Sequence, residues 1–289
     1  MTCGSVMNPG TRLLPARESR AETRRLRVVY RLRRMAADAR RRRPGGVPDR
    51  RLQRRDDRTD RPLPAVRDRA IFVGNPDDIV PHAFGPGLPS IRDWTQQHYD
   101  FAGCITGFDP RHLAGRQALG YRDDERVCIV TVGGSGVGGH LLRRVIAAFP
   151  EAKERGPGLR MIVVAGPRID PGSLPAHDGL EIRSYVHELY RHLAACDLAV
   201  VQGGLTTTME LTAARRPFIY FPLGHHFEQN FHVRHRLDRY RVGRCMDYQT
   251  SGPAEIAAAI ATEINRKIDY RPVAADGAQR AAAMLASLL

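Results

Sequence analysis

From residue 126 onward, short apolar runs alternate with segments in which apolar residues recur every three or four positions. A continuous apolar run is typical of a strand buried in a parallel sheet, and the wider spacing is typical of an amphipathic helix. The expected strands span residues 127–132, 159–165, 180–186, 198–201 and 218–221. The expected helices span 141–149, 188–195, 206–214, 254–264 and 274–288. This alternation predicts an α/β fold with a Rossmann-like, doubly wound parallel sheet.

The first 65 residues have a different pattern, in which runs of Arg alternate with Pro, Gly and Asp. Only residues 26–30 are apolar enough for a strand, and low apolar content with high net charge predicts a disordered Arg-rich arm. Further on, 70–73 resembles a short strand, Ser90 is placed to begin a helix, and 101–105 is another apolar segment. We therefore expect an arm at 1–65, a connecting segment at 66–123 and an α/β domain at 124–289.

The formal net charge of +14 is concentrated in the arm. Residues 1–70 contain 21 Arg and 8 acidic residues, whereas the remainder contains 24 basic and 23 acidic residues. A nearly neutral domain argues against specific nucleic-acid binding by the folded part. The arm itself is expected to be a solvated tail. It could instead anchor the chain to nucleic acid or an anionic membrane. A third hypothesis is off-frame translation of a GC-rich gene, because 43 of the 45 basic residues are Arg.

Cysteine usage and hydropathy give the expected compartment. The five cysteines are scattered and lack C-x-x-C spacing, which fits a reducing cytoplasm. No apolar run is long enough to span a bilayer. His232 and His235 could share a helix face, but no zinc-site spacing accompanies them, so no metal is expected.

Two Gly-rich turns follow expected buried strands, one over 133–139 and the other at Gly203-Gly204. Glycine permits close backbone approach, and the N–H groups at a helix start attract anions. The first turn does not have the G-x-G-x-x-G spacing of a dinucleotide site. A tight structural turn is the alternative. We expect these turns to contact a diphosphate through Gly134, Ser135, Gly136, Gly203, Gly204 and Thr206.

Two further features would complete a nucleotide-sugar site. Glu210 lies in a mostly apolar helix, where an unpaired carboxylate is costly, and its chemistry suits a ribose diol. The alternative is a surface acid paired with Arg215 or Arg216. The loop after Pro222 carries groups that suit sugar hydroxyls. These are His226, Glu228, Gln229 and Asn230.

The turn at 133–139 and the block at 202–230, in this order, resemble the C-terminal, donor-binding domain of GT-B glycosyltransferases. The similarity is greatest to the bacterial N-acetylglucosaminyltransferases that make lipid II and to their actinobacterial relatives. The resemblance implies that the backbone of Val186 binds uracil, Glu210 binds ribose, and Glu228 with Gln229 binds the donor sugar, with neither a cofactor nor a metal. Many relatives carry His or Arg near Gln202, so a cationic diphosphate contact is absent at this position.

The resemblance also implies an activity and its partners. The expected reaction transfers a hexose or N-acetylhexosamine from a UDP-sugar donor to an acceptor hydroxyl. The acceptor would be lipid-linked or a small molecule. The expected location is the cytoplasm. A peripheral contact with the inner face of the membrane is compatible with this location, because related enzymes use lipid acceptors.

In the family, the catalytic base is commonly a His on the N-terminal, acceptor-binding domain. Here no His precedes His82, and fewer than 60 plausible residues of such a domain precede Asp124, against roughly 150 for a full domain. We therefore expect a truncated N-terminal domain, and the catalytic base is unassigned. The main alternative is a non-catalytic nucleotide-sugar-binding remnant, and a sugar-nucleotide 2-epimerase is a further one.

Overall fold

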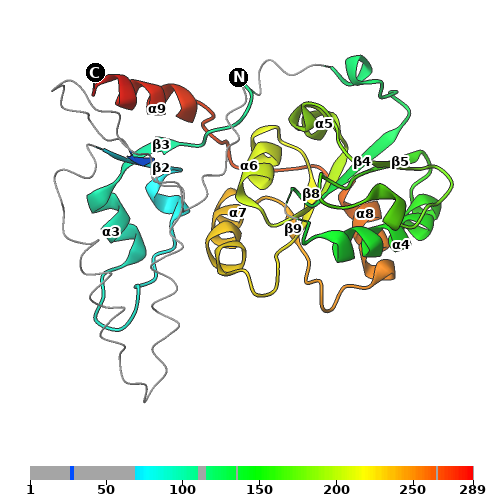
Figure 1. Cartoon of the computed structure of the whole chain (residues 1–289), viewed down its shortest axis with the longest axis horizontal. Helices are drawn as coiled ribbons and strands as arrows, with labels where there is room; N and C mark the ends of the chain where they lie inside the picture. The colour runs from blue at the N-terminus through cyan, green and yellow to red at the C-terminus, as the bar shows by residue number, and fades with distance from the viewer. Residues whose placement is uncertain (1–26, 29–68, 110–114, 135, 265, 289) are drawn as a thin grey trace, which may run out of the picture.

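The computed structural model describes residues 27–28, 69–109, 115–134, 136–264 and 266–288. Apart from Arg27–Val28, the expected Arg-rich arm lies outside these residues. Figure 1 shows a large α/β unit beside a smaller one. None of the helices in the described ranges is long and apolar enough to cross a membrane.

The large unit is built on a parallel six-stranded sheet in the order β6-β5-β4-β7-β8-β9. Its strands are β4 (Arg126–Thr131), β5 (Leu159–Val164), β6 (Leu180–Arg183), β7 (Leu198–Gln202), β8 (Phe218–Phe221) and β9 (Arg244–Cys245). The strand order reverses between β4 and β7, so the prediction of a doubly wound parallel sheet is confirmed. In such sheets ligands bind outside the carboxyl ends of the strands at the reversal point.

Helices cover both faces of this sheet because successive strand residues alternate between two apolar clusters. Cys128 and Val130 pack with α4 and α8 on one face, while Val127 and Ile129 pack with α5, α6 and α7 on the other. The helices are α4 (Gly139–Arg155), α5 (Leu189–Ala195), α6 (Leu205–Ala213), α7 (Arg234–Tyr240) and α8 (Pro253–Glu263). Helix α7 is preceded by a π-helical turn, η5 (Glu228–Val233). The expected helices did not include these two elements, although a shared helix face was considered for His232 and His235.

The smaller unit contains a parallel sheet in the order β1-β2-β3. It comprises β1 (Arg27–Val28), β2 (Ala70–Val73) and β3 (Asp100–Gly103), with η1 (Pro76–Asp78) and α3 (Ile91–His98) between the last two strands. The Ser90 side chain caps α3 by accepting a hydrogen bond from Asp93 N, as predicted. The last helix, α9 (Gly277–Ala286), also lies against this unit, because Gly277 N donates to Cys104 O at 3.1 Å.

A buried ion-pair cluster joins the two units. The Asp78 carboxylate accepts a hydrogen bond from Arg239 Nη1 at 2.6 Å and lies 3.7 Å from Arg236 Nε. Its Oδ2 also accepts from Asn75 N at 2.7 Å. Asp78 and Arg236 are both buried, so the charge of Arg236 depends on the Asp78 carboxylate for compensation, and Arg239 also compensates Asp78.

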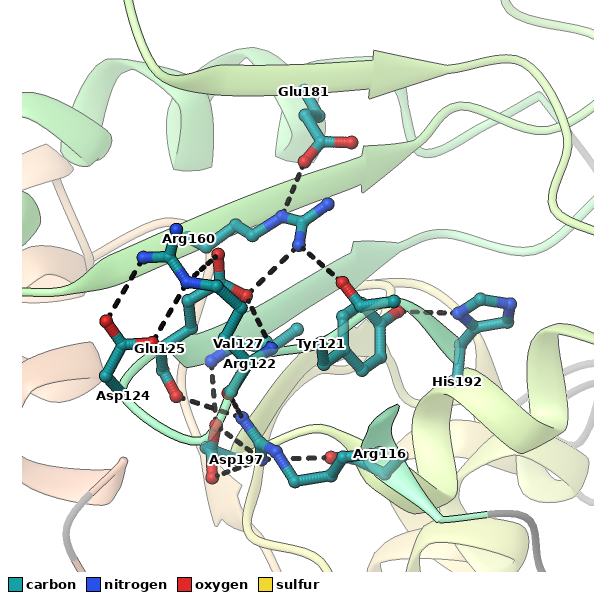
Figure 2. Close-up of polar contacts among 12 residues, drawn as sticks. Arg116, Tyr121, Arg122, Asp124, Glu125, Val127, Arg160, Glu181, His192 and Asp197 are labelled. Atoms are coloured by element: carbon teal, nitrogen blue, oxygen red, sulfur yellow. Dashed lines mark hydrogen bonds and ion pairs between the residues drawn. The ribbon is translucent and has the colours of Figure 1, made fainter. Parts of the chain in front are cut away.

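A second polar network lies at the amino ends of the strands of the large sheet (Figure 2). The Asp197 carboxylate, just before β7, accepts hydrogen bonds from Val127 N at 2.7 Å and from Arg116 Nη1 at 2.9 Å. Arg160, on β5, bridges Glu181 at 2.6 Å and Glu125 at 3.1 Å. Arg116 itself begins a short 3-10 turn, η3 (Arg116–Leu119), and a second such turn, η4 (Pro171–Ser173), lies between β5 and β6. The network therefore fixes the strand starts at the edge opposite to the expected ligand edge.

Candidate functional site

The two Gly-rich turns lie side by side at the point where the strand order reverses. Thr131, the last residue of β4, is in register with Val201, near the end of β7. Each strand leads through its turn into a helix, β4 into α4 and β7 into α6. The two turns that were singled out in the sequence are thus brought to one edge of the sheet.

The first turn presents the start of α4 without a side-chain cap. The N-cap is Gly138, and the first turn of the helix contains no acidic residue. A Cβ on Gly138 would overlap the Val132 side chain, and Gly136 has a positive φ of 76°, so the sequence requires glycine at both positions. Gly134 is exposed on this turn. Ser135, the other expected phosphate contact, lies outside the described residues.

The second turn differs from expectation in which amides it offers. Gly203 N donates to Phe221 O at 3.2 Å, and Gly204 N donates to Gln202 O at 2.8 Å, so both predicted donors are engaged within the fold. The amides available to an anion are instead those that follow, at residues 205–207, because the first N–H groups of a helix lack intrahelical partners. Thr206 is exposed in this first turn, which again contains no acidic residue.

Glu210 lies farther along α6 and is half-buried. Desolvation raises the pKa of its carboxyl to about 7, and a hydrogen bond from the Gly107 backbone opposes the rise. The expected alternative partner, Arg215, donates instead to Tyr270 O at 3.0 Å. Within the described residues, no ion pair joins Glu210 to a cation.

The segment expected to contact a nucleobase lies between β6 and α5. Val186 is buried, whereas the neighbouring Tyr185 is 70% exposed. Glu188, the N-cap of α5, has a left-handed backbone with φ of 49°. Its carboxylate accepts a hydrogen bond from Tyr190 Oη at 2.8 Å. The expected contact between the Val186 backbone and a nucleobase stays a prediction.

The loop after β8 uses much of its polar chemistry to close on itself. Gln229 Oε1 accepts from Leu223 N at 2.9 Å, and Asn230 Nδ2 donates to Leu223 O at 2.6 Å and to His226 O at 3.0 Å. His226 Nδ1 lies 3.4 Å from Gln229 N. The loop touches the second turn, since a Cβ on Gly203 would lie 3.4 Å from Gln229 Oε1. The Asn230 amide nitrogen thus shapes the loop, and Glu228 begins η5 beside it.

Acidic and imidazole groups contributed by the smaller unit are engaged elsewhere. Asp78 lies in the buried ion-pair cluster, and Asp77 lies 3.7 Å from both Arg92 and Arg239. The ring of His82 packs on Phe231 with 4.9 Å between centroids. His235 Nε2 lies 3.1 Å from Asp77 O.

His232 and His235 do not form a metal site with any third ligand among the described residues. Burial lowers the pKa of His232 to about 4, with Arg236 and His235 adding to the shift, so this imidazole is neutral at pH 7.

Comparison with known proteins identifies the domain type. Residues 127–287 match the family model of the glycosyltransferase family 28 C-terminal domain. An uncharacterized glycosyltransferase of Methanopyrus kandleri is 29% identical over 181 residues, which are 62% of this chain and 50% of that protein. A UDP-N-acetylglucosamine–N-acetylmuramyl-(pentapeptide) pyrophosphoryl-undecaprenol N-acetylglucosamine transferase of Symbiobacterium thermophilum is 31% identical over 198 residues, 66% of this chain and 50% of that protein.

Solved structures show the same architecture. The spinosyn rhamnosyltransferase SpnG, complexed with thymidine diphosphate, superposes with a TM-score of 0.51 at 18% identity. The superposition covers 77% of this chain and 57% of the SpnG chain. This likeness supports the GT-B fold. The chain spans about half the length of the curated relatives it matches.

Proposed function

Since this chain belongs to glycosyltransferase family 28, we propose that it binds a UDP-sugar at the carboxyl edge of its six-stranded sheet and transfers a hexose or N-acetylhexosamine to an acceptor hydroxyl. The observation that carries the proposal is the pairing of two uncapped helix starts, those of α4 and α6, at the reversal point of the sheet. Glu210, roughly a turn and a half along α6, supplies a carboxylate for the ribose diol.

Glycosyl transfer breaks the bond between the anomeric carbon and a diphosphate oxygen, so negative charge develops on the departing nucleoside diphosphate. The partial positive charge at the two helix starts would stabilise that charge, by about 0.3–1 kcal/mol for an exposed helix end and up to about 2 kcal/mol when partly buried. Neither first turn contains an acid that would oppose this effect.

The loop containing Glu228 and Gln229 would hold the donor sugar, since it lies against the second turn. The acceptor hydroxyl must lose a proton, and the two carboxylates assigned at the donor edge, Glu210 and Glu228, are engaged with the donor in this proposal. In this proposal the base and the acceptor pocket belong to the acceptor side of the protein. A lipid-linked or small-molecule acceptor, and a cytoplasmic location with peripheral membrane contact, complete the proposal.

Calorimetric titration with UDP, dTDP and a panel of UDP-sugars tests the donor site. We expect UDP and UDP-sugars to bind, and Glu210→Ala to weaken UDP binding about 10- to 100-fold by removing the hydrogen bonds to the diol. Glu154→Ala is the matched control, because Glu154 is an exposed helix carboxyl on α4. Absence of binding by the folded wild-type chain would overturn the proposal.

A non-catalytic nucleotide-sugar-binding module is the second candidate. It is favoured by the engagement of Asp78 in buried ion pairs, which removes this acid as a base at the interface of the two units. Binding without release of UDP, measured against lipid-linked and soluble acceptors, supports this candidate, and acceptor-dependent UDP release contradicts it.

A further inference from the structure

The chain that leaves β3 contacts the candidate donor site in two places. Cys104 O accepts the hydrogen bond from Gly277 N that holds the start of α9. A few residues later, Gly107 contacts α6 and Phe108 contacts α5. Residues 106–108 therefore connect the smaller unit to both helices that flank the expected nucleoside.

The first contact is between Gly107 and Glu210. The Gly107 backbone hydrogen-bonds to the Glu210 carboxylate, and a Cβ on Gly107 would lie 3.4 Å from Glu210 Oε1. Thr106 Oγ1 donates to Phe108 O at 2.5 Å, which closes a small turn around Gly107. A carboxylate bound by a backbone amide is restricted in orientation and leaves its remaining lone pairs for other donors.

The second contact is between Phe108 and Tyr190. Their rings are stacked, with 5.3 Å between centroids and an interplanar angle of 8°. Tyr190 Oη donates to the carboxylate of Glu188, the N-cap of α5, at 2.8 Å. Glu188 follows Val186 by two residues, so the Phe108 ring supports the segment expected beside the nucleobase.

We propose that residues 106–108 are a positioning element of the donor site, in which the Gly107 amide directs the Glu210 carboxylate toward the ribose diol and the Phe108 ring fixes the start of α5. This inference depends on the proposed function. Gly107 and Phe108 are not required to touch the substrate, because they act through Glu210 and Tyr190. The ligand concerned is the nucleoside part of the donor.

A pair of substitutions isolates the backbone amide. Gly107→Pro removes the N–H group, whereas Gly107→Ala retains it and places a Cβ at an ordinary van der Waals distance. Both variants, in the full chain, are titrated with UDP and with 2′,3′-dideoxy-UDP, which lacks the diol. We expect Gly107→Pro to weaken UDP binding about tenfold and Gly107→Ala less than twofold, with the dideoxy nucleotide bound equally by all three proteins. A Gly107→Pro variant that binds UDP like wild type, or that loses both nucleotides equally, overturns the inference.

Phe108 provides an independent test if Gly107→Pro does not fold, as judged by circular dichroism. Phe108→Ala removes the stacked ring, and Phe108→Tyr retains it. We expect Phe108→Ala to weaken UDP binding at least fivefold and to leave binding of inorganic diphosphate unchanged, because that anion has no base. Equal losses for the two ligands, or no loss of UDP binding, contradict the positioning role.

The design separates this inference from the proposed function. If the wild-type chain binds no nucleotide, the proposed function fails. A second outcome is that wild type prefers UDP over its dideoxy analogue, that Glu210→Ala loses this preference, and that Gly107→Pro keeps it. In that case the donor site stands and only the positioning role fails.

Discussion

The Glu210 carboxyl group lies within helix α6, and its one stabilising contact among the described residues is with the Gly107 backbone. The desolvation of this group has a measurable consequence. Because the pKa is raised from 4.5 to about 7, the folded protein binds more protons than the unfolded chain between these two values. Stability contributed by this group is therefore lost as pH rises through that window. A residue that destabilises the fold at neutral pH is typical of a binding site.

The pH dependence gives a test of this burial. We expect Glu210→Gln to be more stable than wild type by about 1–2 kcal/mol at pH 8 and nearly equal at pH 5, because the amide carries no charge to desolvate. Urea unfolding at the two pH values measures the difference. Glu154→Gln, at an exposed carboxyl, should show no such change with pH. A pH-independent difference for Glu210→Gln would show that the carboxyl is not desolvated.

Gly138 and Gly134 make a matched pair within one turn. A Cβ at Gly138 would overlap the Val132 side chain, whereas a Cβ at Gly134 would meet nothing within 4 Å. We expect Gly138→Ala to lower the free energy of unfolding by about 1–3 kcal/mol through overpacking, and Gly134→Ala to leave it nearly unchanged. Chemical denaturation distinguishes them, and equal effects would mean that the turn relaxes around the added methyl group.

At the scale of elements, the sequence pattern located the central strands closely. The run at 127–132 became β4 (Arg126–Thr131), and 218–221 became β8 without change. The prediction of 180–186 was too long, since β6 ends at Arg183. The register of β6 with β5 ends at the pair Val164–Arg183. Two further backbone hydrogen bonds, from Ala165 N to Arg183 O and from Gly166 N to Ser184 O, carry the contact only to Ser184.

The parts of the site that could not be predicted depend on contacts between distant residues. The Gly107–Glu210 contact joins residues far apart in the chain, and neither residue type signals the other. Asn230 was expected to contact a sugar. Its amide nitrogen donates within the loop to Leu223 O and His226 O, contacts that composition did not indicate, and the sugar contact stays a prediction. The binding of the donor sugar by Glu228 and Gln229 likewise stays a prediction.

The ion-pair cluster between η1 and α7 allows an element-scale prediction. Asp78→Ala would leave Arg236 buried without its carboxylate, so we expect a loss of about 3–5 kcal/mol of stability. Asp77→Ala, one residue away, removes an exposed carboxylate at 3.7 Å from its partners and should cost less than about 1 kcal/mol. Thermal unfolding of the two variants measures the contrast. Similar melting temperatures would show that the cluster does not hold the two units together.

At the scale of the whole molecule, the large sheet separates stability from binding by placing them at opposite edges. The amino ends of the strands carry the hydrogen-bonded network around Asp197 and Arg160 (Figure 2). The carboxyl ends carry the uncapped starts of α4 and α6, which leave backbone donors for a ligand. At the first edge the carboxylate of Asp197 and the guanidinium of Arg160 are paired within the fold, although Arg116 Nε is buried there without a hydrogen-bond partner. At the second edge the first backbone N–H groups of two helices are left for an anion.

This separation predicts opposite phenotypes for two acidic residues. Asp197→Ala deprives Val127 N and Arg116 of their acceptor, so we expect it to lower the free energy of unfolding by about 2–4 kcal/mol while leaving the dissociation constant for UDP within twofold of wild type. Glu210→Ala should do the reverse, weakening UDP binding without lowering stability at pH 8. Asp123→Ala, at an exposed acid near the same edge as Asp197, controls for loss of charge. Denaturation curves and calorimetry on the same preparations measure both quantities. If Asp197→Ala weakens UDP binding in proportion to its loss of stability, the two edges of the sheet are coupled. Disruption at the strand starts would then reach the Gly-rich turns through the length of β4 and β7, and the donor site could not be treated as a separate structure.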